Sequence, residues 1–222
     1  MINQPAKCLY LWFFVSVCAL VVSGQRKVEE LTMVYDAAIS NGKSNAVNPV
    51  DGATATVFIK GMMSRSDMKS VYASSTSIHD ARTGTSVILQ EISGQKLLIK
   101  LNAAEWKEKN QRYDDIVFTN TGDTKTIAGY KCIKATATLK DGSDFTVYYT
   151  KDLIPANDSY SPEFRNLKGL PLEYELKQGN TLIRYTLSSI SMNPVPGATF
   201  DIPKNGYREL TYQESKRLGT VR

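Results

Sequence analysis

The sequence predicts a mainly β protein of the α+β class: a strongly curved antiparallel sheet or half-barrel with one or two short helices over its hollow face. Hydrophobic and polar residues alternate along many short segments from Leu31 onward, which is the period of a half-buried strand. Turn-forming residues separate these segments at short intervals. Helical patterns are scarce, and a sheet of about nine to eleven strands curls rather than staying flat.

The first residues form a segment apart from this pattern. Lys7 precedes an apolar run from Cys8 to Val22, and Ser23-Gly24 follows with small side chains. A basic start, a short apolar middle and a small-residue exit are typical of a secretory signal peptide. The run is shorter than the about 20 residues that a membrane-spanning helix needs, so an uncleaved anchor is the less favoured alternative.

We therefore expect residues 1–24 to be a signal peptide and residues 25–222 to form a single half-barrel-like domain. Such a leader would direct export to the periplasm and be cleaved after Gly24. Association of the exported chain with the outer membrane is an open alternative.

The expected strands follow in chain order. They are the segments around Leu31–Tyr35 and Ala55–Ile59, then Ser86–Ile92, Gln95–Leu101, Tyr130–Leu139, Asp144–Thr150, Leu170–Leu176 and Thr181–Met192. Ser93-Gly94 is short enough for a tight hairpin, and Asp141-Gly142 supplies the positive-φ residue of another. Gln178-Gly179-Asn180 is expected to turn the chain into the last strand.

Two helices are expected. Asn102 with Glu105 three residues later is a capping-box pattern, and it predicts a helix over Ala103–Tyr113 that docks through Trp106 and Tyr113. A second helix is expected over Arg208–Leu218. Residues 154–168 contain two prolines and several polar side chains, which indicate a long surface loop with at most one helical turn.

Charge and residue counts exclude several functions. The net charge is +5, but no block of five like charges occurs, so nucleic-acid binding is not expected. His79 is the only histidine, which rules out zinc sites with two imidazoles. No nucleophile-elbow pattern surrounds it. The carboxylate pairs Asp114-Asp115 and Asp141/Asp144 fit turns better than a calcium loop. We predict no catalytic residue, metal or cofactor.

Cys132 is the only cysteine after the predicted leader, so an intramolecular disulfide is not expected in the exported chain. A small buried hydrophobic role is the favoured interpretation. Neighbouring lysines leave open a reactive or intermolecularly bonded thiol.

Several stretches resemble a known group of proteins. They are Ile127–Ala135, Phe145–Asp152, Gly169–Glu173, Arg65–Met68, Phe200–Pro203 and Gly206-Tyr207. The first three resemble exported GLPGLI-type proteins of Gram-negative bacteria and their uncharacterised relatives, although Pro171 here continues directly into Leu172-Glu173. The last three are similar to lipoprotein-carrier-like (LolA-like) half-barrels. The resemblance implies a curved sheet with helices over a hollow that shelters acyl chains.

Apolar strand faces supply the predicted ligand contacts. They are Leu97, Ile99, Trp106, Phe145, Val147, Tyr149, Leu172 and Tyr174. If the sheet curls, these side chains line a hollow, and the predicted function is non-enzymatic binding of a lipid, acyl or other apolar ligand in the cell envelope. The alternative is a structural or interaction module, with the core filled by these same residues and an envelope protein as partner.

Overall fold

The computed structural model describes residues 24–39, 48–70, 73–178 and 181–219. The predicted signal peptide, Gly24 excepted, and the predicted turn at Gly179-Asn180 lie outside the described residues, so neither prediction is tested.

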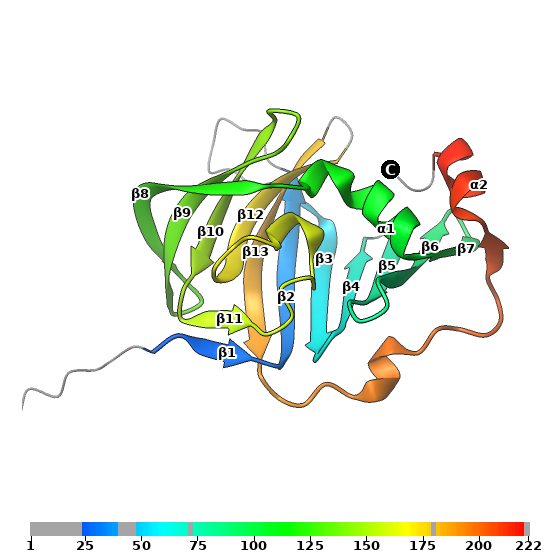
Figure 1. The fold of residues 1–222 in the computed structure, drawn as a ribbon, viewed down its shortest axis with the longest axis horizontal. Coiled ribbons are helices and arrows are strands. Elements are labelled where there is room, and N and C mark those ends of the chain that lie inside the picture. The colour runs from blue at the N-terminus through cyan, green and yellow to red at the C-terminus, as the bar shows by residue number, and fades with distance from the viewer. Residues whose placement is uncertain (1–23, 40–47, 71–72, 179–180, 220–222) are drawn as a thin grey trace, which may run out of the picture.

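Within the described part of the chain, twelve strands form one strongly curved sheet (Figure 1). They are β2 (Glu30–Ile39), β3 (Asn48–Lys60), β4 (Met63–Lys69), β5 (Ala73–Asp80), β6 (Thr85–Ile92), β7 (Gln95–Leu101), β8 (Val117–Ile127), β9 (Tyr130–Thr138), β10 (Asp144–Thr150), β12 (Leu170–Gln178), β13 (Thr181–Ser191) and β14 (Arg208–Leu210). The order across the sheet is β14-β7-β6-β5-β4-β3-β2-β13-β12-β10-β9-β8. The predicted fold class is confirmed.

Strand pairing is antiparallel except at one edge, where β14 runs parallel to β7. A second, two-stranded sheet pairs β1 (Arg26–Val28) in parallel with β11 (Leu153–Pro155). This small sheet lies across the hollow side of the large one (Figure 1).

The predicted hairpins are confirmed. Ser93 and Gly94 have φ of 51° and 80° between β6 and β7, the double positive φ of a two-residue hairpin turn that matches strand twist. Gly142, with φ of 80°, turns the chain between β9 and β10. Asp141 supports this turn by accepting a hydrogen bond from the Ser143 N–H at 2.9 Å.

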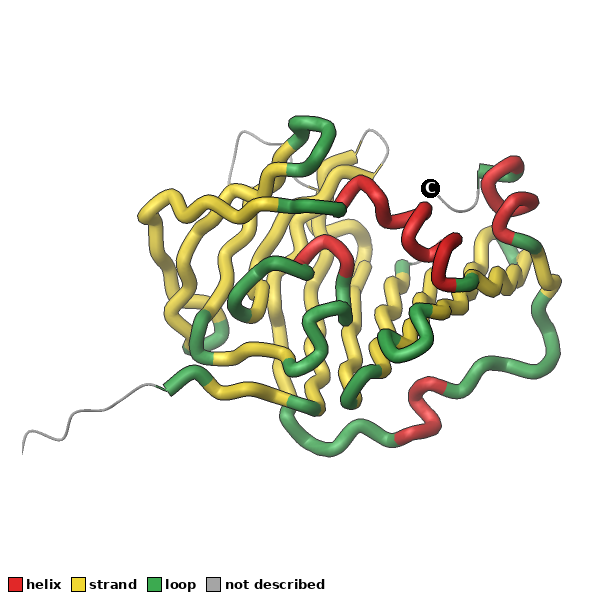
Figure 2. The backbone as a smooth tube through the Cα atoms, in the orientation of Figure 1, coloured by secondary structure: helices red, strands yellow, loops and turns green. Residues whose placement is uncertain are grey.

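The helices are short and few, as Figure 2 shows. They are α1 (Ala103–Asn110), α2 (Tyr212–Arg217) and the single turns η1 (Gln111–Tyr113), η2 (Pro162–Phe164) and η3 (Gly197–Phe200). The first predicted helix is confirmed, with its capping box in place. The predicted loop 154–168 contains the η2 turn, but its first residues belong to β11.

The prediction of helix from Arg208 is wrong for its first residues. Arg208–Leu210 extend along the edge of the sheet as β14 and pair with Leu97–Ile99 of β7. This pairing gives the backbone of an otherwise open edge its hydrogen-bond partners. The helix begins only after Thr211, whose side chain accepts a hydrogen bond from the Glu214 N–H.

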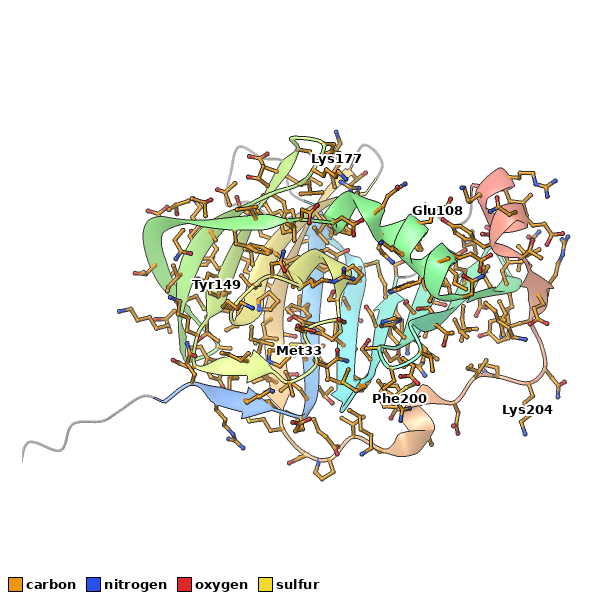
Figure 3. The ribbon with its side chains drawn as sticks, in the orientation of Figure 1. Met33, Glu108, Tyr149, Lys177, Phe200 and Lys204 are labelled. Carbon is orange, nitrogen blue, oxygen red and sulfur yellow. The ribbon has the colours of Figure 1, made fainter. Side chains whose placement is uncertain are left out.

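The main core fills one part of the inner, hollow face of the sheet. Most of its members come from β2, β3, β9, β10, β12 and β13, and Phe164 of η2 covers them from above. The ring of Phe164 lies 4.8 Å from that of Tyr174 and 6.3 Å from that of Phe145, both edge-on. Figure 3 shows Met33 and Tyr149 inside this curve. We call this region the filled half.

The chain after β13 crosses the outer face of the sheet, where Figure 3 labels Phe200 and Lys204. Val195 and Phe200 pack there against Ile78 in a small separate cluster. Two side chains of the sheet hold this segment by its backbone. Lys60 Nζ donates to the Val195 carbonyl oxygen at 2.7 Å, and Arg65 donates to the Thr199 carbonyl oxygen at 2.7 Å. The segment thereby carries the chain to β14 without entering the hollow.

Candidate functional site

The inner face changes character between β3 and β7. One cross-strand row pairs Val57, Ser66, Ser77, Ile88 and Ile99, each directly opposite the next. Residues directly opposite on paired strands share a face. The row is therefore aliphatic on β3, hydroxylated on β4 and β5, and aliphatic again on β6 and β7.

The two flanking rows are also apolar on β3 and β7, but each carries a polar side chain on β5 and on β6. One runs Ile59, Ser64, His79, Ser86, Leu101, and the other runs Ala55, Met68, Ser75, Gln90, Leu97. We call Ser64, Ser66, Ser75 and Ser77 the serine floor. Because serine is small, this floor leaves space above the sheet. In the filled half, larger side chains occupy the corresponding space.

A pocket of about 300 Å³ occupies this space. Its roof comes from two elements: α1 supplies Trp106, Lys109 and Asn110, and the chain around η2 supplies Tyr160, Ser161, Pro162 and Glu163. Ser64 is buried at 3% exposure, whereas Ser66 is exposed. The pocket therefore opens to solvent near Ser66 and closes toward Ser64.

Local interactions fix α1 above the floor. Asn102 accepts a hydrogen bond from the Glu105 N–H at 3.0 Å, and Glu105 accepts one from the Asn102 N–H at 2.9 Å. An ion pair joins Glu108 to Lys216 of α2. Gly84, with φ of +72°, lets the β5–β6 turn approach the start of the helix, because a Cβ there would meet the Ala103 Cβ at 2.9 Å.

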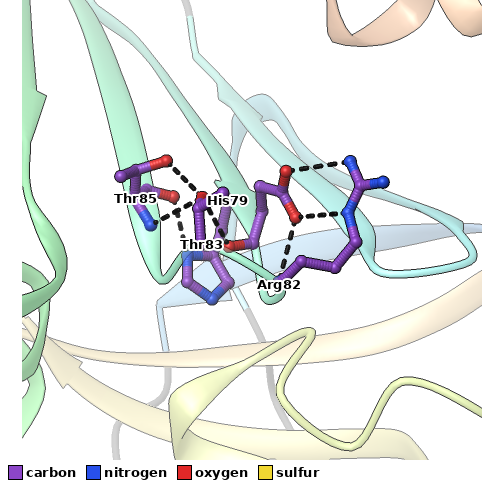
Figure 4. A network of polar contacts seen from close by, with 5 residues as sticks. His79, Arg82, Thr83 and Thr85 are labelled. Atoms are coloured by element: carbon purple, nitrogen blue, oxygen red, sulfur yellow. Dashed lines mark hydrogen bonds and ion pairs between the residues drawn. The ribbon is translucent and has the colours of Figure 1, made fainter.

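His79 and Trp106 form one wall of the pocket. Their rings stack with centroids 4.8 Å apart and an interplanar angle of 20°. His79 Nδ1 lies 3.1 Å from the Thr85 carbonyl oxygen (Figure 4) and 2.8 Å from Ser86 Oγ. A carbonyl oxygen only accepts hydrogen bonds, so Nδ1 donates to Thr85 in the tautomer that carries its hydrogen there, and accepts from the Ser86 hydroxyl in the other tautomer. Burial lowers the pKa of His79, so the ring is an uncharged wall of the pocket at neutral pH.

The turn beside this wall is tied down separately. Asp80 accepts hydrogen bonds from the Arg82 backbone at 2.9 Å and from the Arg82 guanidinium at 3.0 and 3.1 Å, and the Thr83 and Thr85 hydroxyls meet at 2.7 Å (Figure 4). Because this network holds the turn, it keeps Thr85 in place as the partner of His79.

The roof carries polar groups in unusual surroundings. Burial raises the pKa of Glu163, with hydrogen bonds and the nearby Lys109 opposing the shift. Burial lowers the pKa of Lys109, which Glu163 partly offsets. The Tyr160 hydroxyl is buried and finds no hydrogen-bond partner among the described residues. A buried hydroxyl left without a partner costs about 1–3 kcal/mol, so its position calls for an explanation.

Seven of the eight predicted ligand contacts lie in packed clusters. Phe145, Val147, Tyr149, Leu172 and Tyr174 belong to the main core. Leu97 and Ile99 pack with Leu210 and Tyr212 under α2. Trp106 alone lines the pocket. The set remains a prediction as ligand contacts, but the structure does not bring it together around one space.

The sequence analysis missed the residues that do surround a space. The serine floor has a readable signal, because Ser64/Ser66 and Ser75/Ser77 each have the two-residue spacing of one strand face. Tyr160 and Glu163 gave no such signal, since they lie in a segment expected to be a surface loop.

Cys132 is buried in the main core. Its thiol donates to the Tyr130 oxygen at 3.4 Å, and burial raises its pKa to about 11. A thiol with so high a pKa is protonated at neutral pH and unreactive, which agrees with the structural role favoured from the sequence.

No group of three or more His, Cys, Asp or Glu side chains gathers within the described residues to hold a metal ion. None of the helices in this part of the chain is both long and apolar enough to cross a membrane.

Comparison with known proteins gives one family match. The family described as "Domain of unknown function (DUF4412)" matches residues 45–161, which include the serine floor, α1 and Tyr160. The resemblance to GLPGLI-type proteins remains a resemblance. No curated protein matches the chain at a significant level.

PNGF-II is similar to this chain in fold. A structure of PNGF-II in space group P21 aligns with a TM-score of 0.52 and 14% identity, covering 86% of this chain and 33% of that one. This chain thus spans about a third of the length of PNGF-II. MucB aligns with a TM-score of 0.29 and 12% identity over 79% of this chain and 58% of that one. LprF from Mycobacterium bovis aligns with a TM-score of 0.32 and 12% identity, covering 75% of this chain and 87% of that one. The likeness to PNGF-II concerns the fold alone.

Proposed function

This chain belongs to the DUF4412 family, and we propose that it is an exported, non-enzymatic binding protein of the cell envelope that holds a small ligand in the polar pocket. The observation that carries the proposal is the serine floor. Four small hydroxylated residues stand on the inner face beside the apolar column of β3 (Ala55, Val57 and Ile59), at positions where a filled core would have larger apolar side chains.

The roof supports the same function. Glu163 lines the pocket beside Lys109, and burial opposes the ionisation of its carboxyl group. A buried ionisable group of this kind reduces stability unless a partner such as a bound molecule compensates it. Perturbed titratable groups that converge on a concave pocket are typical of binding and active sites.

Binding is favoured over catalysis because of the chemistry around His79. Nucleophilic catalysis needs a base aimed at a hydroxyl or thiol. The hydroxyl that His79 Nδ1 contacts is that of Ser86, which is buried and does not line the pocket, and the Cys132 thiol lies in the main core. The pocket therefore lacks, among the described residues, a nucleophile with an activating base.

The pocket favours a polar ligand over the lipid or acyl chain expected from the sequence. Its main apolar contacts are Ile88, Trp106 and Pro162, against a larger set of hydroxyl, amide and charged side chains. An acyl chain among the predicted apolar contacts would have to displace packed core residues, which costs several kcal/mol.

Export is compatible with the fold. Gly24 is exposed, and the first described element begins at Arg26. Removal of residues 1–24 would therefore take none of the described strands or helices with it.

The alternative, an interaction module for an envelope protein partner, has one observation in its favour. Strand β8 lies at an edge of the sheet, and an open edge is a template for another strand. Its pairing with β9 is interrupted between Asn120 and Thr124, and Asp123 and Lys125 add charges. A bulged, charged edge is typical of protection against pairing, so the pocket is the better candidate.

Native mass spectrometry of the exported chain, purified from its own envelope, tests the proposal. Wild-type protein should carry a small additional mass. Ser75→Leu/Ser77→Leu, which fills the floor, should lose it. Ser74→Leu, on the same strand but the opposite face, should keep it. Wild-type protein at its bare polypeptide mass under gentle ionisation would refute the proposal.

A further inference from the structure

We infer that the polar pocket takes a neutral, polyhydroxylated ligand the size of one sugar ring. This inference rests on the proposed function and deepens it by naming the class of ligand. It follows from the pocket's charge, its hydrogen-bonding groups, its aromatic wall and its volume.

The charges that line the pocket cancel. Lys109 and Glu163 are its charged side chains, and each stabilises the ionised form of the other. His79 adds no charge, because burial lowers its pKa. An anionic ligand would meet the carboxyl group of Glu163, and a cationic one would meet the ammonium of Lys109. Burying an uncompensated charge costs more than burying a hydroxyl group, so the lining favours a neutral molecule.

The hydrogen-bonding groups match hydroxyls. The serine floor offers side chains that both donate and accept, and Ser161 adds another on the roof. A ligand hydroxyl likewise donates once and accepts, so each ligand oxygen can satisfy a floor serine and a roof group together. Hydroxyls on both sides of one ring would fit between them.

The wall and the volume complete the match. Trp106 remains partly exposed although His79 covers one of its ring faces. The negative face of an aromatic ring attracts positively polarised hydrogens, such as the C–H groups of a sugar ring. The volume of about 300 Å³ is at the small end for ligand pockets, which suits one ring better than a chain of several.

The fluorescence of Trp106 gives a direct readout. Trp12 lies in the predicted leader, so Trp106 is the single tryptophan of the exported chain. The exported chain is titrated with D-glucose, D-galactose, D-mannose and N-acetyl-D-glucosamine. Glycine, L-alanine and hexanoate serve as probes of the zwitterionic and acyl classes. Saturation-transfer NMR on the same samples detects binding independently of the fluorophore.

At least one of the four sugars should bind saturably. Its Kd should be at least tenfold weaker for Ser75→Leu/Ser77→Leu and within twofold of wild type for Ser74→Leu. Saturable binding of hexanoate or an amino acid without any sugar would overturn the ligand class while leaving the binding function intact. Failure of every probe would also overturn the class, and the native mass then decides the binding function separately.

Discussion

The two halves of the curved sheet differ in what occupies their concave face: one is filled by side chains and the other holds a pocket. In the filled half, Val147 of β10 faces Ala135 of β9, both with 0% exposure, beneath the ring of Phe164. On β4 and β5, Ser66 and Ser77 form a cross-strand pair like that of Val147 and Ala135, but a pocket lies above them. Curvature alone therefore does not make a hollow. Side-chain size on the floor and the segment above it decide whether a concave face becomes core or site.

The largest expected effect belongs to the roof of the filled half. Phe164→Ala should lower the free energy of unfolding by about 3–5 kcal/mol, the range for truncating a buried aromatic, because Phe164 packs against Phe145 and Tyr174. Urea unfolding measures it. A loss below about 1 kcal/mol would mean that this half is not tightly filled.

Trp106→Ala should cost less, under about 2 kcal/mol. Trp106 is only partly buried; its ring stacks on His79 and packs against the small cluster around Ile99. Thermal and urea unfolding beside Phe164→Ala give the comparison. Equal losses for the two variants would contradict the difference between the two halves.

Local features of both halves were predicted from the sequence, but the contrast between the halves was not. The alternation of Leu170, Leu172 and Tyr174 predicted a half-buried strand correctly, because the period of two is a local property. The capping box at Asn102 and the hairpin at Ser93-Gly94 were predictable for the same reason.

The features that could not be predicted depend on contacts between residues far apart in the sequence. The serine spacing gains meaning only when β4 and β5 pair in the register that sets Ser66 opposite Ser77. The placement of Phe164 over Tyr174 depends on how residues 154–168 fold back across the sheet, which no local pattern specifies. A helix was predicted for Arg208–Leu210 because the local sequence does not reveal the partner of this segment. That partner is the edge strand β7, more than 100 residues earlier in the chain.

A smaller, pH-dependent effect is expected at Glu163. Its raised pKa means that the folded chain binds this proton more tightly than the unfolded chain does. The stability due to the neutral form is therefore full below the ordinary pKa of 4.5 and is lost as pH rises through the folded-state pKa.

Glu163→Gln keeps the neutral shape at all pH values. The variant should have a higher Tm than wild type at pH 7, and the difference should vanish near pH 4. Differential scanning calorimetry from pH 3.5 to 8 measures this. A wild type that is the more stable protein at pH 7 would show that pairing with Lys109 outweighs burial.

The most direct test of the central contrast inserts the same side chain into both halves. Ser77→Leu and Ala135→Leu each enlarge a small residue on the inner face, one over the pocket and one in the core. Overpacking a filled core costs about 1–3 kcal/mol, whereas a leucine in open space costs little. Urea unfolding should find Ala135→Leu destabilised by at least about 1 kcal/mol and Ser77→Leu within about 0.5 kcal/mol of wild type. Equal destabilisation of both variants would contradict the account, because the floor would then be core.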